Sequence, residues 1–347
     1  MKFTHFAVTL AAASALGASA AGADPIATPG VIASLSHVVT IGSTVDPLNG
    51  DVNPYGLAIS PSSAGKIAAG DLVVCNFNDK LNIQGLGTTI EVLEPVAGAK
   101  PKHLSGDPRL TGCAAIAMGD AQPWVAALDA NDNPIVSATG QILSPLNEFK
   151  WQGPWGQAFV AGPKSPPAFY ESNADDGSIV RIDLAAKFTY DTIVRGLAVN
   201  HGVPGSILAP SGLTYDAKRD VLYIVDGAVN GVVAICGPAS IPSGGITARG
   251  GYFVGPFASR AKILYRGAPL SAPISAALLF NGDLVVGNTN DNRLIELTPS
   301  GRVAGLRVLD TGAPGALFGI AASGTSQQTT QIYFNDDNDN TVKVLKR

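Results

Sequence analysis

The chain of 347 residues has few charged side chains and few of the residues that usually carry chemistry. Charged residues make up 14% of the sequence, which argues against long helices, because their polar faces need many Lys and Glu side chains. The net charge is −4 and no Lys/Arg cluster is present, so nucleic-acid binding is not expected. No apolar run beyond the N-terminal region is long enough to span a membrane.

The three cysteines, Cys75, Cys113 and Cys236, form no Cys-x-x-Cys pair and show no Cys/His spacing that would suggest a zinc or redox site. Two interpretations remain open. Cys75 and Cys113 fall in adjacent repeats and are the candidate disulfide pair, which would leave Cys236 as a free thiol. Alternatively, all three are buried thiols that act as small apolar side chains.

The N-terminus has the pattern of a secretory signal peptide. Lys2 supplies a positive charge, an apolar Ala-rich stretch covers residues 6–16, and small residues at 18–20 and 21–23 give two candidate cleavage points. The sequence therefore predicts a signal peptide over 1–23, a flexible leader over 24–35 and one domain over 36–347. We expect export to the periplasm or the extracellular space.

The C-terminal region contains one unit written twice. Residues 283–297 and 331–345 superimpose at a constant offset of 48 without a gap. Each copy has an apolar run, an Asn/Asp-rich turn and a second apolar run, which is typical of a β-hairpin. The unit recurs upstream, and the openings of the six repeats follow: Pro54, Gly112, Pro154, Pro210, Pro273 and Leu317. This spacing suits a four-stranded propeller blade.

These repeats predict an all-β, six-bladed β-propeller. The openings are small and apolar because the innermost strands crowd around a central axis, whereas bulkier strands fill the space between blades. An open ring would expose two sheet edges. The last repeat ends after three strands, so we expect the N-terminal strand at about 37–42 to join the last blade and close the ring.

The repeat motif resembles the NHL repeat. Its form is Gly56-Leu-Ala-Ile59 or Gly212-Leu-Thr-Tyr215, then an apolar strand, an Asp/Asn turn and a second strand. The chain is also similar to the TolB-like, SMP-30/gluconolactonase-like and strictosidine-synthase-like six-bladed propellers. The resemblance covers nearly the whole mature chain. It implies the architecture and leaves function open, because the superfamily includes binding proteins, lactonases and lyases.

The resemblance also provides a test for catalytic residues. SMP-30-like lactonases hold a divalent metal with a Glu near the start of the first blade, two Asn and an Asp, but Asn53 stands at that start here. Related lyases use several histidines, and the mature chain has His37, His103 and His201. The sequence thus favours a non-catalytic binding scaffold. The alternative is a metal-dependent hydrolase, lactonase or lyase whose ion is held by some of Asn53, Asn173, Asp226 and Asn288.

The hairpin turns repeat an Asn or Asp at the end of the second strand of each blade: Asn76, Asp129, Asn173, Asp226, Asn288 and Asp336. The structural interpretation is that each side-chain oxygen accepts backbone N–H groups of its own turn. Calcium is the alternative, because residues 129–133 and 336–340 carry oxygens at alternate positions. Both loops lack the glycine and the final Glu of an EF-hand. No cofactor is assured, and a divalent cation such as Ca²⁺ stays open.

The axial ligand face should lie where the loops between blades meet the hairpin turns. Candidate lining residues in those loops are Asp46, Asn53, Trp151, Trp155 and His201. The tryptophans could stack on a ligand or pack between blades, and His201 could act as a base or lie exposed on its loop. The expected partner is a small molecule or another protein, and we expect a monomer.

Overall fold

The computed structural model describes residues 29–144, 146, 148–184 and 187–347. The predicted signal peptide and residues 24–28 lie outside this part of the chain. In the part that the structure describes, no helix has both the length and the apolar character needed to cross a membrane.

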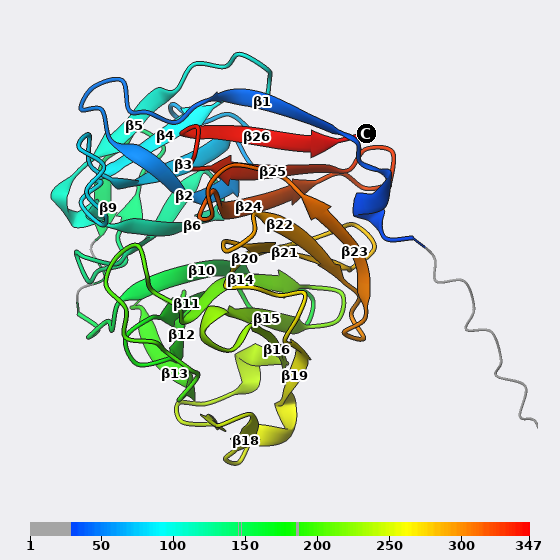
Figure 1. Cartoon of the computed structure of the whole chain (residues 1–347). Coiled ribbons are helices and arrows are strands. Elements are labelled where there is room, and N and C mark those ends of the chain that lie inside the picture. The colour runs from blue at the N-terminus through cyan, green and yellow to red at the C-terminus, as the bar shows by residue number, and fades with distance from the viewer. Residues whose placement is uncertain (1–28, 145, 147, 185–186) are drawn as a thin grey trace, which may run out of the picture.

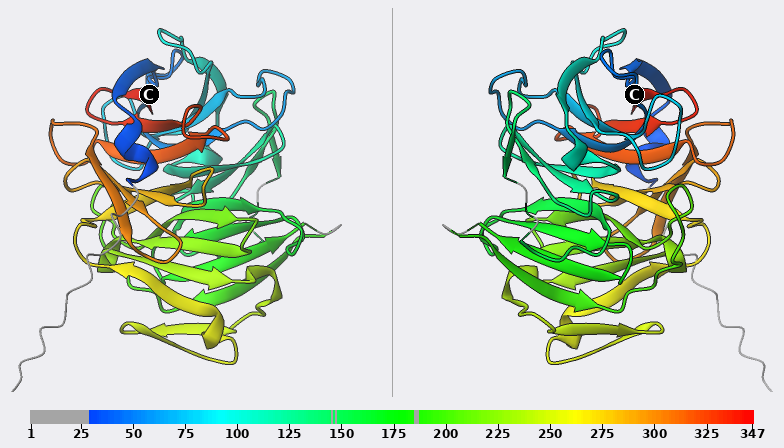
Figure 2. Two further views of the ribbon diagram at one scale, coloured as in Figure 1. Left: turned by 90° about the vertical axis from the view of Figure 1, so that its right-hand side faces the viewer. Right: turned by 90° about the vertical axis from the view of Figure 1, so that its left-hand side faces the viewer.

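Six β-sheets surround a common axis, as the all-β six-bladed propeller prediction required (Figure 1). The innermost strands are β2, β6, β10, β14, β20 and β24, and each contacts the next. The last of them, β24, also contacts β2, so the ring is closed. Within each blade the strands follow one another outward from the axis, as in the order β2-β3-β4-β5, and Figure 2 shows the sheets from two further sides.

The first half of the ring contains blades 1 to 3. Blade 1 consists of β2 (Val52–Ile59), β3 (Leu72–Asn78), β4 (Thr89–Leu93) and β5 (Lys102–Gly106). Blade 2 consists of β6 (Cys113–Gly119), β7 (Gln122–Ala127), β8 (Ile135–Val136) and β9 (Ile142–Ser144). Blade 3 consists of β10 (Pro154–Val160), β11 (Ala168–Asn173), β12 (Ser178–Asp183) and β13 (Thr189–Arg195).

The second half contains blades 4 to 6. Blade 4 consists of β14 (Pro210–Asp216), β15 (Val221–Asp226), β16 (Gly231–Cys236) and β19 (Ala261–Arg266). Blade 5 consists of β20 (Pro273–Leu278), β21 (Leu284–Asn288), β22 (Arg293–Leu297) and β23 (Val303–Val308). Blade 6 consists of β24 (Leu317–Ser323), β25 (Gln331–Asp336), β26 (Thr341–Lys346) and β1 (His37–Ser43).

One insertion departs from the four-stranded plan. The segment between β16 and β19 of blade 4 forms β17 (Ile246–Arg249) and β18 (Tyr252–Val254). These strands extend blade 3, because β17 pairs in parallel with β13. The short 3₁₀ helices are η1 (Val31–Ser34), η2 (Pro108–Leu110), η3 (Gly227–Val229), η4 (Pro238–Ser240) and η5 (Ala258–Arg260).

Blade 6 contains both ends of the described chain. The N-terminal strand β1 pairs antiparallel with the last strand β26, from His37 opposite Lys346 to Ser43 opposite Thr341. Ile41 of β1 is 2% exposed and packs with Leu93 of blade 1 and Val344 of β26. The first strand of the domain is therefore fixed by main-chain hydrogen bonds and by apolar packing together.

The strand register corrects the sequence alignment in the second blade. In blades 3 and 5 the Asn of the Asn/Asp column pairs with the first residue of the innermost strand, Asn173 with Pro154 and Asn288 with Pro273. The first residue of the innermost strand in blade 2, Cys113, pairs with Ala127. Blade 2 therefore carries Ala127 at this column, and Asp129 lies two residues further into the turn. The opening of this repeat is displaced as well, because Cys113-Ala-Ala115 lacks the Pro and the Gly that mark this place in blades 1, 3 and 4.

Part of the predicted flexible leader is packed against blade 5. Residues Val31–Ser34 form η1, in which the backbone N–H of Val31 donates to Glu296 Oε1 at 2.8 Å. The N–H of Ile32 donates to Glu296 Oε2 at 2.9 Å. Ile32 and Leu35 are 1% and 0% exposed. The buried Glu296 carboxylate thus satisfies the free donors at the start of η1 and fixes the segment that leads into β1.

Adjacent blades are joined by apolar packing and, at one joint, by a covalent bond. Each blade contributes its middle strands to the cores between blades, where the side chains of β3, β15 and β21 are buried. Between blades 1 and 2 the structure joins Cys75 and Cys113 in a disulfide with an S–S distance of 2.11 Å. Cys236 is a free thiol and is exposed.

A buried polar chain links blades 2 and 3. Gln157 Nε2 donates to Asn133 Oδ1 at 2.8 Å, and Asn133 Nδ2 donates to Glu171 Oε2 at 2.6 Å. Glu171 is 0% exposed, and its Oε1 has no hydrogen-bond partner among the described residues. Burial raises the pKa of Glu171 well above its usual value, against hydrogen bonds from Asn133 and the backbone of Trp155.

The packing of β1 can be tested by a matched pair of substitutions. Ile41→Ala should lower the free energy of unfolding by about 2–5 kcal/mol, because it leaves a cavity between blades 6 and 1. Val38→Ala lies on the same strand at a position that is 42% exposed and should change it by less than about 0.5 kcal/mol. Urea unfolding measures both values. Equal effects of the two substitutions would show that β1 is not packed as described.

The buried Glu171 carboxyl predicts a pH dependence of stability. Because its pKa is higher in the folded than in the unfolded chain, the folded state binds the proton more tightly. The free energy of unfolding should therefore fall as pH rises above about 4.5, by at most about 1.4 kcal/mol per pH unit. Glu171→Gln has no such proton, so its stability relative to the unsubstituted protein should increase from pH 5 to pH 8 in urea unfolding.

The control for this pH series is Glu94→Gln. Glu94 is a surface residue whose pKa is lowered by the hydrogen bond and the charge of Lys102. Its substitution should therefore not produce a relative gain in stability with rising pH. A Glu171→Gln curve parallel to that of the unsubstituted protein between pH 5 and pH 8 would refute the assignment of Glu171 as a buried neutral acid.

Candidate functional site: an apolar axial cavity

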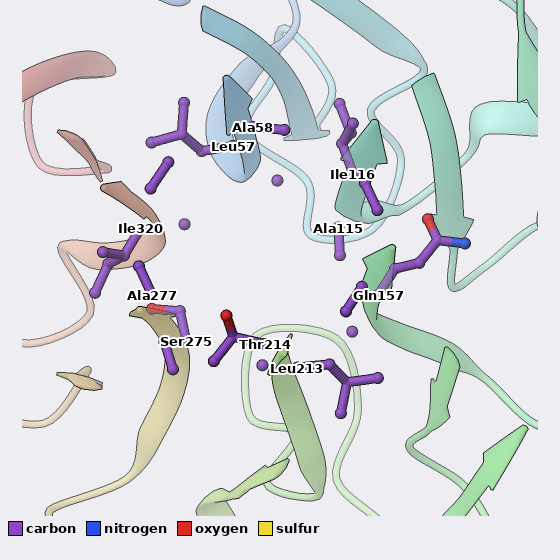
Figure 3. A pocket seen from close by; sticks show the side chains of 18 of the residues that line it. Leu57, Ala58, Ala115, Ile116, Gln157, Leu213, Thr214, Ser275, Ala277 and Ile320 are labelled. Carbon is purple, nitrogen blue, oxygen red and sulfur yellow. The ribbon is translucent and has the colours of Figure 1, made fainter. Parts of the chain in front are cut away.

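The axis of the ring holds a cavity of about 570 Å³ that is lined by residues of all six innermost strands (Figure 3). Gly56, Gly156, Gly212 and Gly319 lie in the lining, and a Cβ at each would come within 3 Å of atoms of other strands. Small residues thus allow the six backbones to approach the axis while a space remains between them. The cavity lies in the size range of small-molecule pockets.

The side chains that line the cavity are mainly apolar, although polar atoms contribute about half of the lining surface. Its side chains include Leu57, Ala58, Ala115, Ile116, Met118, Leu213, Ala277 and Ile320. Three polar side chains are labelled in Figure 3. The amide of Gln157 points away from the axis, the hydroxyl of Ser275 donates to the carbonyl of Phe318, and the hydroxyl of Thr214 points into the cavity. The carboxylate in the described lining is Asp120, which is exposed together with Pro61 at the ends of the innermost strands.

A group of four aromatic side chains closes the other end of the cavity. Tyr55 is stacked between Phe77 and Phe318, with ring centroids 4.1 and 3.8 Å apart. Trp155 meets the rings of Tyr55 and Phe77 edge-on, at 5.9 Å in both cases. We call Tyr55, Phe77, Trp155 and Phe318 the aromatic plug. Burial, together with the negative charge of Asp337, raises the pKa of Tyr55, so its hydroxyl is neutral at physiological pH.

A second cavity of about 370 Å³ lies on the opposite side of the aromatic plug. Tyr55, Trp155 and Phe318 line both cavities and separate them. Ile274 of β20 also lines both cavities, and the remaining lining comes from loops and turns: 205–208, Ala272, Thr289, Asn290, Pro314 and Gly315. This is the face on which the sequence placed the ligand site, where loops between blades meet the hairpin turns.

One member of the predicted ligand-binding set, Trp155, lies on the axis. Trp151 is 0% exposed and its indole N–H donates to the carbonyl of Leu146 at 2.8 Å, so it packs between blades. His201 is exposed in the loop that precedes the lining residues 205–208. Asn53 is buried with a φ of 64°, and its N–H donates to Asn340 Oδ1 at 2.7 Å. A ligand role for these residues stays a prediction.

The predicted metal set is distributed among separate turns. Asn173 Nδ2 donates to Ser178 Oγ at 2.9 Å, Asp226 accepts the N–H of Ala228 at 3.1 Å, and Asn288 Nδ2 donates to Asp291 Oδ1 at 3.1 Å. Burial raises the pKa of Asp226 to about 6, against hydrogen bonds from the backbone. The described linings of the two axial cavities include none of these three residues and not Asn53. Of these three contacts, the one at Asp226 agrees with the structural interpretation of the Asn/Asp column, because its oxygen accepts a backbone N–H of its own turn, whereas Asn173 and Asn288 donate through Nδ2 to side-chain oxygens.

Asp46 lies away from the axis, beside two residues that the sequence did not single out. Its Oδ2 is 2.5 Å from His103 Nδ1, and Glu91 completes the group. Burial and the charge of Asp46 raise the pKa of Glu91 to about 10. Burial also acts to raise the pKa of Asp46, but hydrogen bonds with His103, Asn49, Glu91 and Leu48 outweigh it and lower the pKa. The available sequence signal was an isolated Glu within the apolar run 88–93.

Comparison with known proteins gives a fold likeness without a sequence match. No protein-family profile matches the chain, and no curated protein matches it. A gluconolactonase from Xanthomonas campestris superimposes with a TM-score of 0.62 and 11% identity over 92% of this chain and 93% of its own.

Two further solved structures are similar at the same level. A catalytically inactive virginiamycin B lyase from Staphylococcus aureus with quinupristin has a TM-score of 0.54 and 16% identity, over 90% of this chain and 99% of its own. Regucalcin, a calcium-binding protein from Agrobacterium tumefaciens, has a TM-score of 0.56 and 12% identity, over 88% and 95%. At these identities the likeness establishes the fold alone, which is that of the SMP-30/gluconolactonase-like and virginiamycin B lyase six-bladed propellers.

Proposed function

We propose that the chain is an exported, NHL-like propeller that acts as a binding scaffold and takes a small apolar molecule in its axial cavity. The observation that carries this proposal is the set of mainly apolar side chains that line the 570 Å³ cavity, which the aromatic plug closes at one end. These side chains offer no hydrogen-bond partners to water. An apolar ligand that contacts them therefore gains by leaving water, and the polar atoms of the lining stay available for one or two polar groups of the ligand.

The geometry favours a neutral, elongated ligand. The cavity follows the innermost strands from the aromatic plug to Pro61 and Asp120, so an extended molecule can lie along the axis. The hydroxyl of Thr214 can exchange one hydrogen bond with a polar group of the ligand. Rings of Trp155 and Phe318 at the closed end provide flat apolar contacts.

The alternative function is a metal-dependent hydrolase, lactonase or lyase, as the names of the structural neighbours suggest. Such an enzyme needs several oxygen or nitrogen ligands that converge on one point of the axis. Asn173, Asp226 and Asn288 are instead engaged in three separate turns. The carboxylate in the described axial lining is Asp120 at the exposed end. These observations support the binding scaffold over the enzyme, and an axial Ca²⁺ stays an untested prediction.

Export is part of the proposal and has independent support. The N-terminal 23 residues have the charge, apolar stretch and small residues of a secretory signal. The disulfide between Cys75 and Cys113 is of a kind that persists in oxidising compartments such as the periplasm and the extracellular space. Detection of the processed chain in the periplasm or the medium would test this part of the proposal.

Titration with the neutral fluorescent dye Nile red tests the axial site. The purified protein should enhance the dye emission saturably, with one site per chain. Ala115→Phe and Thr214→Phe each place a ring in the cavity and should weaken dye binding at least about tenfold, because occupied volume is no longer available to the ligand. Two blocking variants are used so that a folding defect in one does not decide the result.

The matched control is Ala97→Phe, which adds the same ring at an exposed turn outside the axial lining. It should bind the dye like the unsubstituted protein. Thermal unfolding of all variants checks that they are folded. Unchanged dye binding in both folded blocking variants would exclude the axial cavity as the apolar site.

A further inference from the structure

The connection between blade 6 and blade 1 contains a group of metal-ligating side chains away from the axis. Asp46 lies in the loop between β1 and β2, Glu91 lies on β4 and His103 on the outermost strand β5. One ligand atom from each lies within 4.8 Å of the others. The loop between β4 and β5 also reaches this seam, because the N–H of Ala99 donates to the carbonyl of Ile41 on β1. These strands are adjacent in Figure 1.

The loop that carries Asp46 is built around its carboxylate. Asp46 Oδ1 accepts the N–H of Leu48 at 2.8 Å and of Asn49 at 2.6 Å. These bonds direct Oδ2 toward His103 Nδ1. The side chain of Asp46 is 0% exposed, whereas that of His103 is 21% exposed. The site is therefore buried on the side of the carboxylates and reaches solvent along the imidazole.

One oxygen atom of this group, Glu91 Oε2, has no hydrogen-bond partner among the described residues, and Glu91 is 0% exposed. The nitrogen of the Asn76 amide faces the same carboxylate, with Nδ2 3.5 Å from Glu91 Oε1. Unpartnered buried atoms also occur elsewhere in the described chain, Glu171 Oε1 among them, but Glu91 Oε2 is distinguished by its place beside the carboxylate of Asp46 and the imidazole of His103, where a ligand, a water or an ion can satisfy it. Two carboxylates in contact also require a positive charge or a proton between them.

We propose that Asp46, Glu91 and His103 bind one divalent transition-metal ion of the Zn²⁺ class. Imidazole nitrogen together with carboxylate oxygen suits Zn²⁺ and its first-row neighbours, whereas Ca²⁺ and Mg²⁺ take oxygen ligands alone. Zn²⁺ ligands at about 2.0–2.1 Å in tetrahedral geometry lie about 3.3 Å apart. The 2.5 Å between Asp46 Oδ2 and His103 Nδ1 must widen accordingly, which the half-buried imidazole on the edge strand permits.

The ion would join the segment that closes the ring to the first blade. Asp46 follows β1, the outermost strand of blade 6, and the other ligands belong to blade 1. A bound ion would stabilise the folded state by mass action, because the ligands are not assembled in the unfolded chain. The site is separate from the axial cavity, so the proposal does not depend on the proposed function.

Calorimetric titration with Zn²⁺ tests the site in protein purified with a histidine-free tag and pretreated with a chelator. One ion should bind per chain and raise Tm. Glu91→Gln removes the charge but keeps the shape of the side chain, and its amide can donate to Asp46, so the variant should fold. Glu91→Gln and His103→Gln should each weaken Zn²⁺ binding at least about 100-fold, since loss of outer partners alone costs 10- to 100-fold.

The controls are His201→Gln and Glu171→Gln. The first removes an exposed histidine and the second a buried carboxyl of blade 3, and both should bind Zn²⁺ like the unsubstituted protein. Failure of the unsubstituted protein to bind at about 100 µM Zn²⁺ would overturn the proposal, as would binding that Glu91→Gln leaves intact or that His201→Gln abolishes. If His103→Gln does not fold, the Glu91→Gln titration decides the question by itself.

Discussion

The pairing of β1 with β26 is the interaction on which the rest of the structure depends. A ring of sheets in which each blade contacts only its neighbours gains its final interface when the first and last blades meet. Here the last blade is itself built from a strand of one end of the chain and three strands of the other, and it packs against blade 1 through β24 and β25. The axial cavity and the aromatic plug include residues of both blade 6 and blade 1. The Asp46 group joins blade 1 to the loop that follows β1.

Crowding at the axis determines the chemistry of the site. Six backbones converge there, so glycine and alanine recur in the innermost strands, and the side chains around the space that is left are mainly apolar. Polar side chains lie instead in turns and between blades. Asn173 and Asn288 bond within their own turns, and Gln157 turns its amide away from the axis toward Asn133. The fold requires small or apolar residues on the innermost strands, whereas a metal-dependent axial site would require oxygen or nitrogen ligands there.

Sequence patterns predicted what depends on local periodicity. The apolar runs and their turns indicated six blades, and the missing fourth strand of the last repeat pointed to residues 37–42, which the structure has as His37–Ser43. The second blade was misaligned, since it has Ala127 in place of the Asn or Asp of the column and no Pro or Gly at its opening. The packed part of the leader was not foreseen, because its anchor, Glu296, lies 264 residues from Ile32.

The candidate sites were harder to predict for a related reason. Trp155 was recognised by its place before the third blade, and it lines the axis. Asp46, Glu91 and His103 come from a loop and two strands that are distant in sequence, and no fixed spacing connects them. The apolar cavity itself has no motif, because it is defined by the side chains that are too small to fill it. Its existence follows from how closely the strands approach.

The aromatic plug also determines how the axial cavity can exchange its contents. Tyr55 and its neighbours block passage through the disc, so the two faces of the propeller do not communicate along the axis. A molecule held in the larger cavity arrives and departs at a single opening, the one marked by Asp120. The rate at which such a molecule leaves then depends on the residues around that opening. The loops of the opposite face are free to contact a different partner at the same time.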